Sequence, residues 1–160
     1  MEIGSILNIF GVMSMFTGLY FLARSLKSDN TVSNICSEIG GLLLLLSLPI
    51  WVLMMGAEIS AIDAAEDFGN DVGASIIAAS KMLQMSGVML VVGVMLLGIA
   101  LTLLRKYKGI VGILFVITSG IAFISMIASL DGIGFIGWMG MFIMMFVTGI
   151  LTTLQKENQT

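Results

Sequence analysis

The chain is built around five long apolar runs that carry almost no charge. Only seven of its 160 residues are Lys or Arg, and ten are Asp or Glu. An α-helix rises about 1.5 Å per residue, so roughly 20 residues cross the ~30 Å hydrocarbon core of a bilayer. We therefore predict an all-α membrane protein, a bundle of five transmembrane helices, with spans at residues 3–23, 39–57, 83–104, 109–130 and 133–154.

The composition supports one membrane domain over residues 1–160. Hydrophobic residues make up 58% and charged residues 11% of the chain, whereas soluble domains are roughly half apolar and about a quarter charged. The longest segment outside the runs, residues 58–82, is too short to bury a core of its own. The acidic start, Met1-Glu2, lacks the basic region of a signal peptide, so we expect the first run to remain as a helix.

Basic residues predict how the helices are oriented. If the chain crosses five times, Lys81 lies on one side and six basic residues lie on the other: Arg24, Lys27, Arg105, Lys106, Lys108 and Lys156. Lys and Arg favour the cytoplasmic side of a membrane. We therefore expect the N-terminus outside and the C-terminus in the cytoplasm, in the inner (cell) membrane of a prokaryote.

The segment between the second and third runs reads EISAIDAAEDFGNDVGASIIAASK over residues 58–81. Its apolar residues keep a helical spacing on both sides of Phe68-Gly69. Gly69 suits the position after a helix end and Asp71 suits an N-cap. We thus predict that helices two and three continue outside the membrane as a helical hairpin, with the third running from Val72 to Tyr107, about 54 Å. Rows of small residues predict where the two extensions touch: Ala57, Ala61 and Ala65 on one, and Ala74 with Ala78 and Ser75 with Ala79 on the other.

This hairpin has three interpretations. It is a self-packed pair of helices with a solvated acidic face, a docking surface for a partner subunit, or a cation site. The candidate docking residues are Asp63, Glu66, Asp67, Phe68 and Asp71. The acidic residues lack the ligand spacing of an EF-hand loop, so a calcium site would rest on acidity alone.

The residue types argue against catalysis. The chain has no histidine and a single cysteine, Cys36, which removes the commonest general base, most zinc sites and any CxxC redox pair. Fourteen methionines include the MxxxM pairs Met85/Met89 and Met141/Met145, a spacing that suits Cu(I), but Met is also the flexible filler of apolar interfaces. We expect no enzyme activity, no cofactor and no resident metal, and with a net charge of −3 no nucleic-acid partner.

A few polar residues in or beside the runs are candidates for an ion or solute path. Intramembrane ionisable groups mark such paths because they are costly to insert, yet the carboxylates here lie at the predicted membrane borders. The candidate path or gate residues are Ser47, Pro49, Glu58, Gln84 and Asp131. Asp131-Gly132 is also typical turn chemistry, which predicts a tight hairpin between the fourth and fifth helices.

Glycine and serine supply faces for close helix contacts. Gly132, Gly134, Gly137 and Gly140 crowd the fifth run, Gly87, Gly93 and Gly98 lie along the third, and Ser14 and Gly18 lie on the first. Membrane helices associate through close packing at such small residues. We therefore favour a non-catalytic subunit or scaffold of a larger membrane complex, homo- or hetero-oligomeric, with a small channel or transporter as the alternative.

Overall fold

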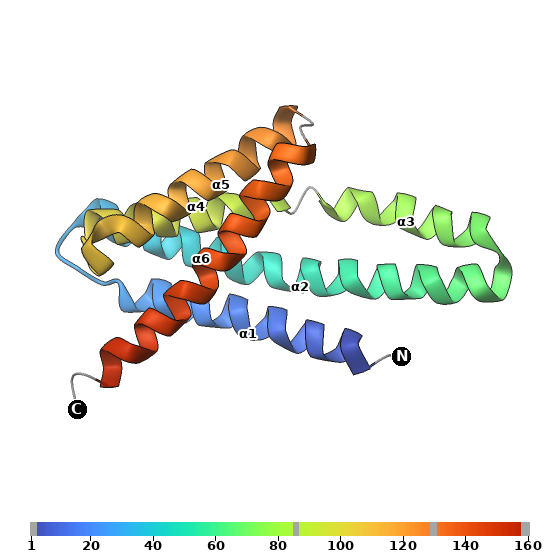
Figure 1. Ribbon diagram of the computed structural model, residues 1–160, viewed down its shortest axis with the longest axis horizontal. Helices are drawn as coiled ribbons and strands as arrows, with labels where there is room; N and C mark the ends of the chain where they lie inside the picture. Colours follow the sequence, from blue (N-terminus) through green and yellow to red (C-terminus); the bar gives the residue numbers. More distant parts are fainter. Residues whose placement is uncertain (1–2, 85–86, 129–130, 158–160) are drawn as a thin grey trace.

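The structure, a computed structural model, describes residues 3–84, 87–128 and 131–157, and every element in this part of the chain is helical (Figure 1). The elements are α1 (Ile3–Ser25), α2 (Thr31–Phe68), α3 (Asn70–Gln84), α4 (Gly87–Leu103), the short 3-10 turn η1 (Lys106–Gly109), α5 (Ile110–Ala128) and α6 (Asp131–Glu157).

Helices α1, α2, α4, α5 and α6 pack side by side in this order, and α3 packs on α2. α2 packs against α1, α3 and α4, α4 packs against α5, and α5 packs against α6. α4 lies between α2 and α5, and Leu90, Val94 and Leu97 on it are fully buried. α1 starts on the side of the bundle from which α3 extends, and α6 ends on the opposite side (Figure 1).

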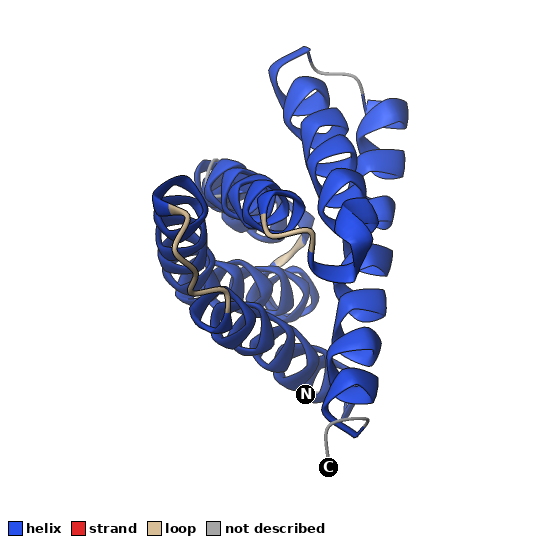
Figure 2. Cartoon of the chain, turned by 90° about the vertical axis from the view of Figure 1, so that its left-hand side faces the viewer, coloured by secondary structure: helices blue, strands red, loops and turns tan. Residues whose placement is uncertain are grey.

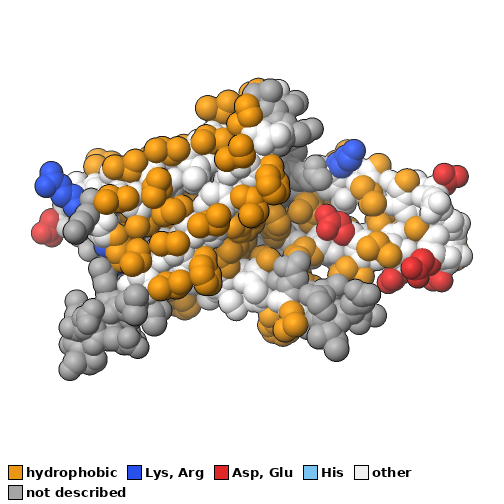
Figure 3. All heavy atoms as spheres, viewed as in Figure 1, with side chains coloured by type: hydrophobic (Ala, Val, Ile, Leu, Met, Phe, Trp, Pro, Cys, Tyr) orange, Lys and Arg blue, Asp and Glu red, His pale blue; other side chains and the backbone are white. Residues whose placement is uncertain are grey.

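Four helical segments are long and apolar enough to cross a membrane, and residues 9–25 of α1 form a shorter apolar helix. Five crossing helices fit this arrangement. Large apolar side chains cover the outside of the bundle, including Phe21, Leu46, Ile117 and Ile136, each at least half exposed. Figure 3 shows an orange apolar band over the bundle, with both basic and acidic side chains at the end away from the arm, and with most of the acidic side chains and a further basic one on the side of the arm. Such a surface suits lipid, and the chain is a multi-pass membrane protein.

Glycines lie where successive helices cross. A Cβ on Gly40 of α2 would stand 2.9 Å from the carbonyl oxygen of Gly93 on α4, and one on Gly93 would stand 3.1 Å from that of Gly40. Gly98 of α4 and Gly112 of α5 face each other in the same way, at 2.9 and 2.6 Å. These contacts bring backbones closer than any side chain allows, which is how helices adhere in the absence of a hydrophobic driving force.

The third predicted helix is wrong at its C-terminal end. α4 ends at Leu103 rather than at Tyr107, because Arg105 (φ 50°) and Tyr107 (φ 54°) adopt left-handed backbone conformations that end the helix and form η1. At the other end, α3 and α4 lie on either side of residues 85 and 86, which are outside the described part of the chain. The connection between α4 and α5 is short, residues 104–109.

Two other helix boundaries differ from the prediction. α2 begins at Thr31, eight residues before the apolar run, because the Asn30 side chain accepts a hydrogen bond from the Ser33 backbone N–H at 3.1 Å and caps the helix. Asp131 and Gly132 belong to α6 instead of forming the turn before it. An acidic residue at a helix N-terminus is favourable, so the same Asp serves equally well as the first residue of α6.

Candidate functional site

The predicted extension of helices two and three is present as a two-helix arm, formed by residues 58–68 of α2 and by α3. Figure 1 shows the arm extending beyond the ends of α4, α5 and α6. Its two helices pack through Gly73, where a Cβ would meet the Ala61 carbonyl oxygen at 2.6 Å and the Ala65 Cβ at 2.8 Å. Ala61 and Ala65 of the predicted row Ala57, Ala61 and Ala65 are thus at the contact.

The rows predicted on α3 are wrong. Ala74, Ser75, Ala78 and Ala79 are exposed, and the buried residues of α3 are Gly73 and Ser80. Gly73 has no side chain at all, so it permits a closer approach to α2 than any alanine, and it decides which face of α3 turns inward.

The loop at the arm's tip follows one prediction and departs from another. Gly69 ends α2 with φ 100°, and its N–H donates to the Ala65 carbonyl oxygen at 3.1 Å, as expected of a glycine after a helix end. Asp71 is not the N-cap of α3, because α3 already begins at Asn70 and Asp71 lies in its first turn.

The arm's charged side chains face water. Glu58, Asp63, Glu66, Asp67 and Asp71 are all exposed, and the single basic residue of the arm, Lys81, is exposed near its base. In the part of the chain that the structure describes, no group of three Asp, Glu, Cys or His side chains is placed to hold a metal ion. The described acidic side chains of the arm are therefore spread along its surface and do not form one cluster.

Large apolar side chains are exposed among these charges. Phe68, at the tip, is 75% exposed, and it lies in the chain between Asp67 and Asp71. Ile62 on α2 is 61% and Ile77 on α3 is 46% exposed. The arm therefore presents apolar side chains beside its carboxylates.

Of the candidate path residues, the structure describes the side chains of Ser47, Pro49 and Glu58, and these three do not line a common cavity. Ser47 is fully buried, and its hydroxyl donates to the Leu44 carbonyl oxygen of its own helix at 2.9 Å. Pro49 is exposed on the outside of α2, and Glu58 is exposed on the arm. The side chains of Gln84 and Asp131 lie outside the described residues.

Other polar groups inside the bundle are also satisfied locally. Ser119, Ser125 and Thr148 each donate to a carbonyl oxygen three or four residues earlier in their own helices. Among the described residues, every buried side-chain nitrogen or oxygen has a hydrogen-bond partner. Met141 and Met145, one of the MxxxM pairs, are buried in the hydrophobic core, while Met85 lies outside the described residues.

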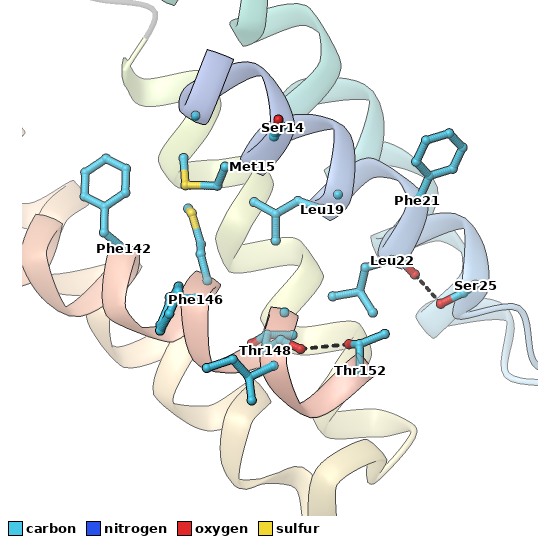
Figure 4. Close-up of a pocket in the computed structure, with 15 residues that line it drawn as sticks. Ser14, Met15, Leu19, Phe21, Leu22, Ser25, Phe142, Phe146, Thr148 and Thr152 are labelled. Atoms are coloured by element: carbon cyan, nitrogen blue, oxygen red, sulfur yellow. Dashed lines mark hydrogen bonds between the residues drawn. The ribbon is translucent and has the colours of Figure 1, made fainter. Parts of the chain in front are cut away.

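A groove between α1 and α6 was not predicted. α6 crosses the bundle obliquely and lies along one side of it, where it packs on α5 and barely contacts α1 (Figures 1 and 2). The resulting cavity has a volume of about 960 Å³. Gly11, Ser14 and Gly18 form part of the α1 wall, and Phe146 and Gly149 part of the α6 wall. Figure 4 shows Met15, Leu19 and Leu22 extending from α1 into this space.

The small residues of α1 are the one sequence feature that relates to the groove. Ser14 and Gly18 were read as a face for tight helix contact, but a Cβ added to Gly11 or Gly18 would meet nothing within 4 Å. This small-residue face is therefore left open within the chain. No protein family, no curated protein and no solved structure matches this chain.

Proposed function

We propose that this protein is a non-catalytic integral membrane subunit that docks a partner chain through the tip of its arm, outside the cytoplasm. The proposal includes the orientation expected from the basic residues, with the N-terminus and the arm outside and the C-terminus in the cytoplasm. The observation that carries it is the arm tip, where Phe68 stands 75% exposed between carboxylates and beyond the apolar band.

The chemistry of the tip specifies the kind of partner. Asp67 and Asp71 flank Phe68, and Glu66 and Asp63 lie two and five residues before it on α2, without a basic side chain nearer in the chain than Lys81. A partner with an apolar socket for the aromatic ring and Lys or Arg around it would match both features. Buried aromatic anchors dominate binding energy, and complementary charges around them set specificity and association rate.

Photo-crosslinking tests the proposal in intact membranes. A benzophenone amino acid replaces Phe68 in the full chain, and matched positions are Ile127, 71% exposed in the apolar band, and Val32, 58% exposed at the opposite end. We expect a discrete protein adduct from position 68 that is absent from positions 127 and 32. Charge reversal by Asp67→Lys with Asp71→Lys should reduce that adduct by about tenfold or more, because like charges then face the partner.

A control reverses a charge at the other end of the molecule. Asp29→Lys, in the exposed loop between α1 and α2, should leave the adduct at position 68 unchanged. Either of two outcomes would contradict the proposal: no protein adduct at position 68, or an adduct equally strong after the charge reversal at the tip.

A further inference from the structure

We propose that the chain docked at the arm tip is a different protein, with a basic surface outside the cytoplasm, and not a second copy of this chain; this assignment rests on the proposed docking function. The sequence alone leaves both homo-oligomers and hetero-oligomers open. The positions of the described charged side chains decide between them.

The arm tip is acidic and has no basic neighbour. Glu66, Asp67 and Asp71 are exposed around Phe68. Lys81, the basic residue of the arm, comes ten residues after Asp71 on α3, which places it about 15 Å away along the helix. The Debye length at physiological ionic strength is about 8 Å, so Lys81 does little to offset the carboxylates at the tip.

A second copy in the same membrane would oppose these charges with its own. The bias of the basic residues gives every copy the same orientation, so two neighbouring arms stand at the same height. In a two-fold dimer the axis is then perpendicular to the membrane, and each tip faces the other tip. Asp67 and Asp71 of one copy would lie next to the same carboxylates of the other, and like charges across an interface oppose association.

The other basic side chains of a second copy are out of reach. The connection between α1 and α2 and the turn η1 lie at the end of the molecule away from the arm (Figure 1). The basic side chains described there are Arg24, Lys27, Arg105 and Lys106. A hydrocarbon core of ~30 Å separates them from the arm of a neighbouring copy. The Lys or Arg that matches the tip therefore belongs to a different chain.

The height of the tip specifies which part of that chain makes the contact. Residues 58–68 extend α2 by about 16 Å beyond the predicted membrane border at Glu58. A contact at Phe68 therefore needs a folded part of the partner that stands clear of the membrane, whereas a short loop between two spans stays at its surface. The partner thus carries an extramembrane domain or helical extension, with an apolar socket for Phe68 and with Lys or Arg around the socket.

Co-expression of two tagged copies tests the identity of the partner. One full-length copy carries a benzophenone amino acid in place of Phe68, and the other is the parent chain with a different tag. After irradiation of open membrane fragments, we expect the adduct to contain the first tag alone and to differ in mass from twice the 17.1 kDa chain. Raising the salt from about 0.05 to about 0.5 M before irradiation should reduce the adduct about threefold or more, because exposed charges are then screened.

Lys81 supplies the matched control. Lys81→Glu in the second copy should leave the adduct unchanged, whereas it would weaken an adduct in which Lys81 of a neighbouring copy pairs with the tip. The purified chain alone, in proteoliposomes, should give no chain-to-chain adduct from position 68. Mass spectrometry of the cross-linked partner peptide should find Lys or Arg next to the attachment site.

The outcomes separate the identity of the partner from docking itself. An adduct that contains both tags, or a chain-to-chain adduct from the purified protein, would show that the tip binds a second copy; docking would stand and the heteromeric partner would be wrong. An adduct with a different protein that does not respond to salt would refute the basic surface. The absence of any adduct at position 68 would refute docking.

Discussion

Gly112→Ala is expected to destabilise the folded bundle strongly. A Cβ at this position would meet the Gly98 carbonyl oxygen and the Thr102 backbone nitrogen, both at 2.6 Å, and would approach the Thr102 hydroxyl more closely still. Two of these three atoms belong to the backbone of α4, so the clash cannot be relieved by a change of rotamer. Overpacking typically costs about 1–3 kcal/mol, and a clash with backbone should reach the upper part of that range.

Unfolding in mixed micelles with increasing denaturing detergent measures this loss. Gly120→Ala is the matched control, because it makes the same change on the same helix where nothing lies within 4 Å of the added carbon. The control should unfold at the same detergent fraction as the parent. An equal stability of Gly112→Ala and Gly120→Ala would show that α4 and α5 do not cross through Gly98 and Gly112.

Gly73→Val should separate the arm's two helices while leaving the membrane bundle folded. The added Cβ would stand 2.6 Å from the Ala61 carbonyl oxygen, and α3 has almost no other support, since its contacts outside α2 are few. A local cost of about 1–3 kcal/mol is therefore enough to open the arm. Distances between spin labels at the exposed residues Glu66 and Ser75, in a Cys36→Ser background, should lengthen and broaden.

Ala74→Val provides the comparison for this variant. Ala74 is the next residue of α3 and is exposed, so valine there introduces the same β-branched side chain without entering the contact between the two helices. Its label distances should match those of the parent. The docking proposal adds that Gly73→Val weakens the protein adduct at position 68, because the tip is then no longer held in one geometry. Unchanged distances in Gly73→Val would contradict the arm packing.

Much of the architecture followed from the sequence because hydrophobic length is a direct constraint. An apolar run such as residues 109–130 has to form a helix in a bilayer, because only a helix satisfies all of its backbone hydrogen bonds. The segment from Arg105 to Lys108 is so short that the two helices it joins have to lie side by side. The arm was predictable for a related reason. Apolar residues kept a helical spacing on both sides of Gly69, and glycine there matched a helix end.

Which small residues pack inside was not predictable from the sequence alone. Gly93, Gly98 and Gly137 lie at helix crossings, whereas Gly18 faces an open groove, although all four look alike in an apolar run. The difference lies in the tilt of each helix, and the tilt is set by packing rather than by length. The open groove arises because α6 packs along α5 and barely contacts α1. This arrangement depends on the angles at which the helices cross, and the spacing of residues in the sequence does not reveal those angles.

The proposed docking function requires the arm to lie outside the cytoplasm and in water. In a Cys36→Ser background, single cysteines at Phe68 and Lys106 report the two ends of the molecule to a membrane-impermeant maleimide applied to intact cells. Phe68→Cys is expected to react without permeabilisation, because the side chain is 75% exposed at the arm tip, and Lys106→Cys only after permeabilisation. The reverse pattern, or protection of position 68 under both conditions, would contradict the proposed orientation and the docking function with it.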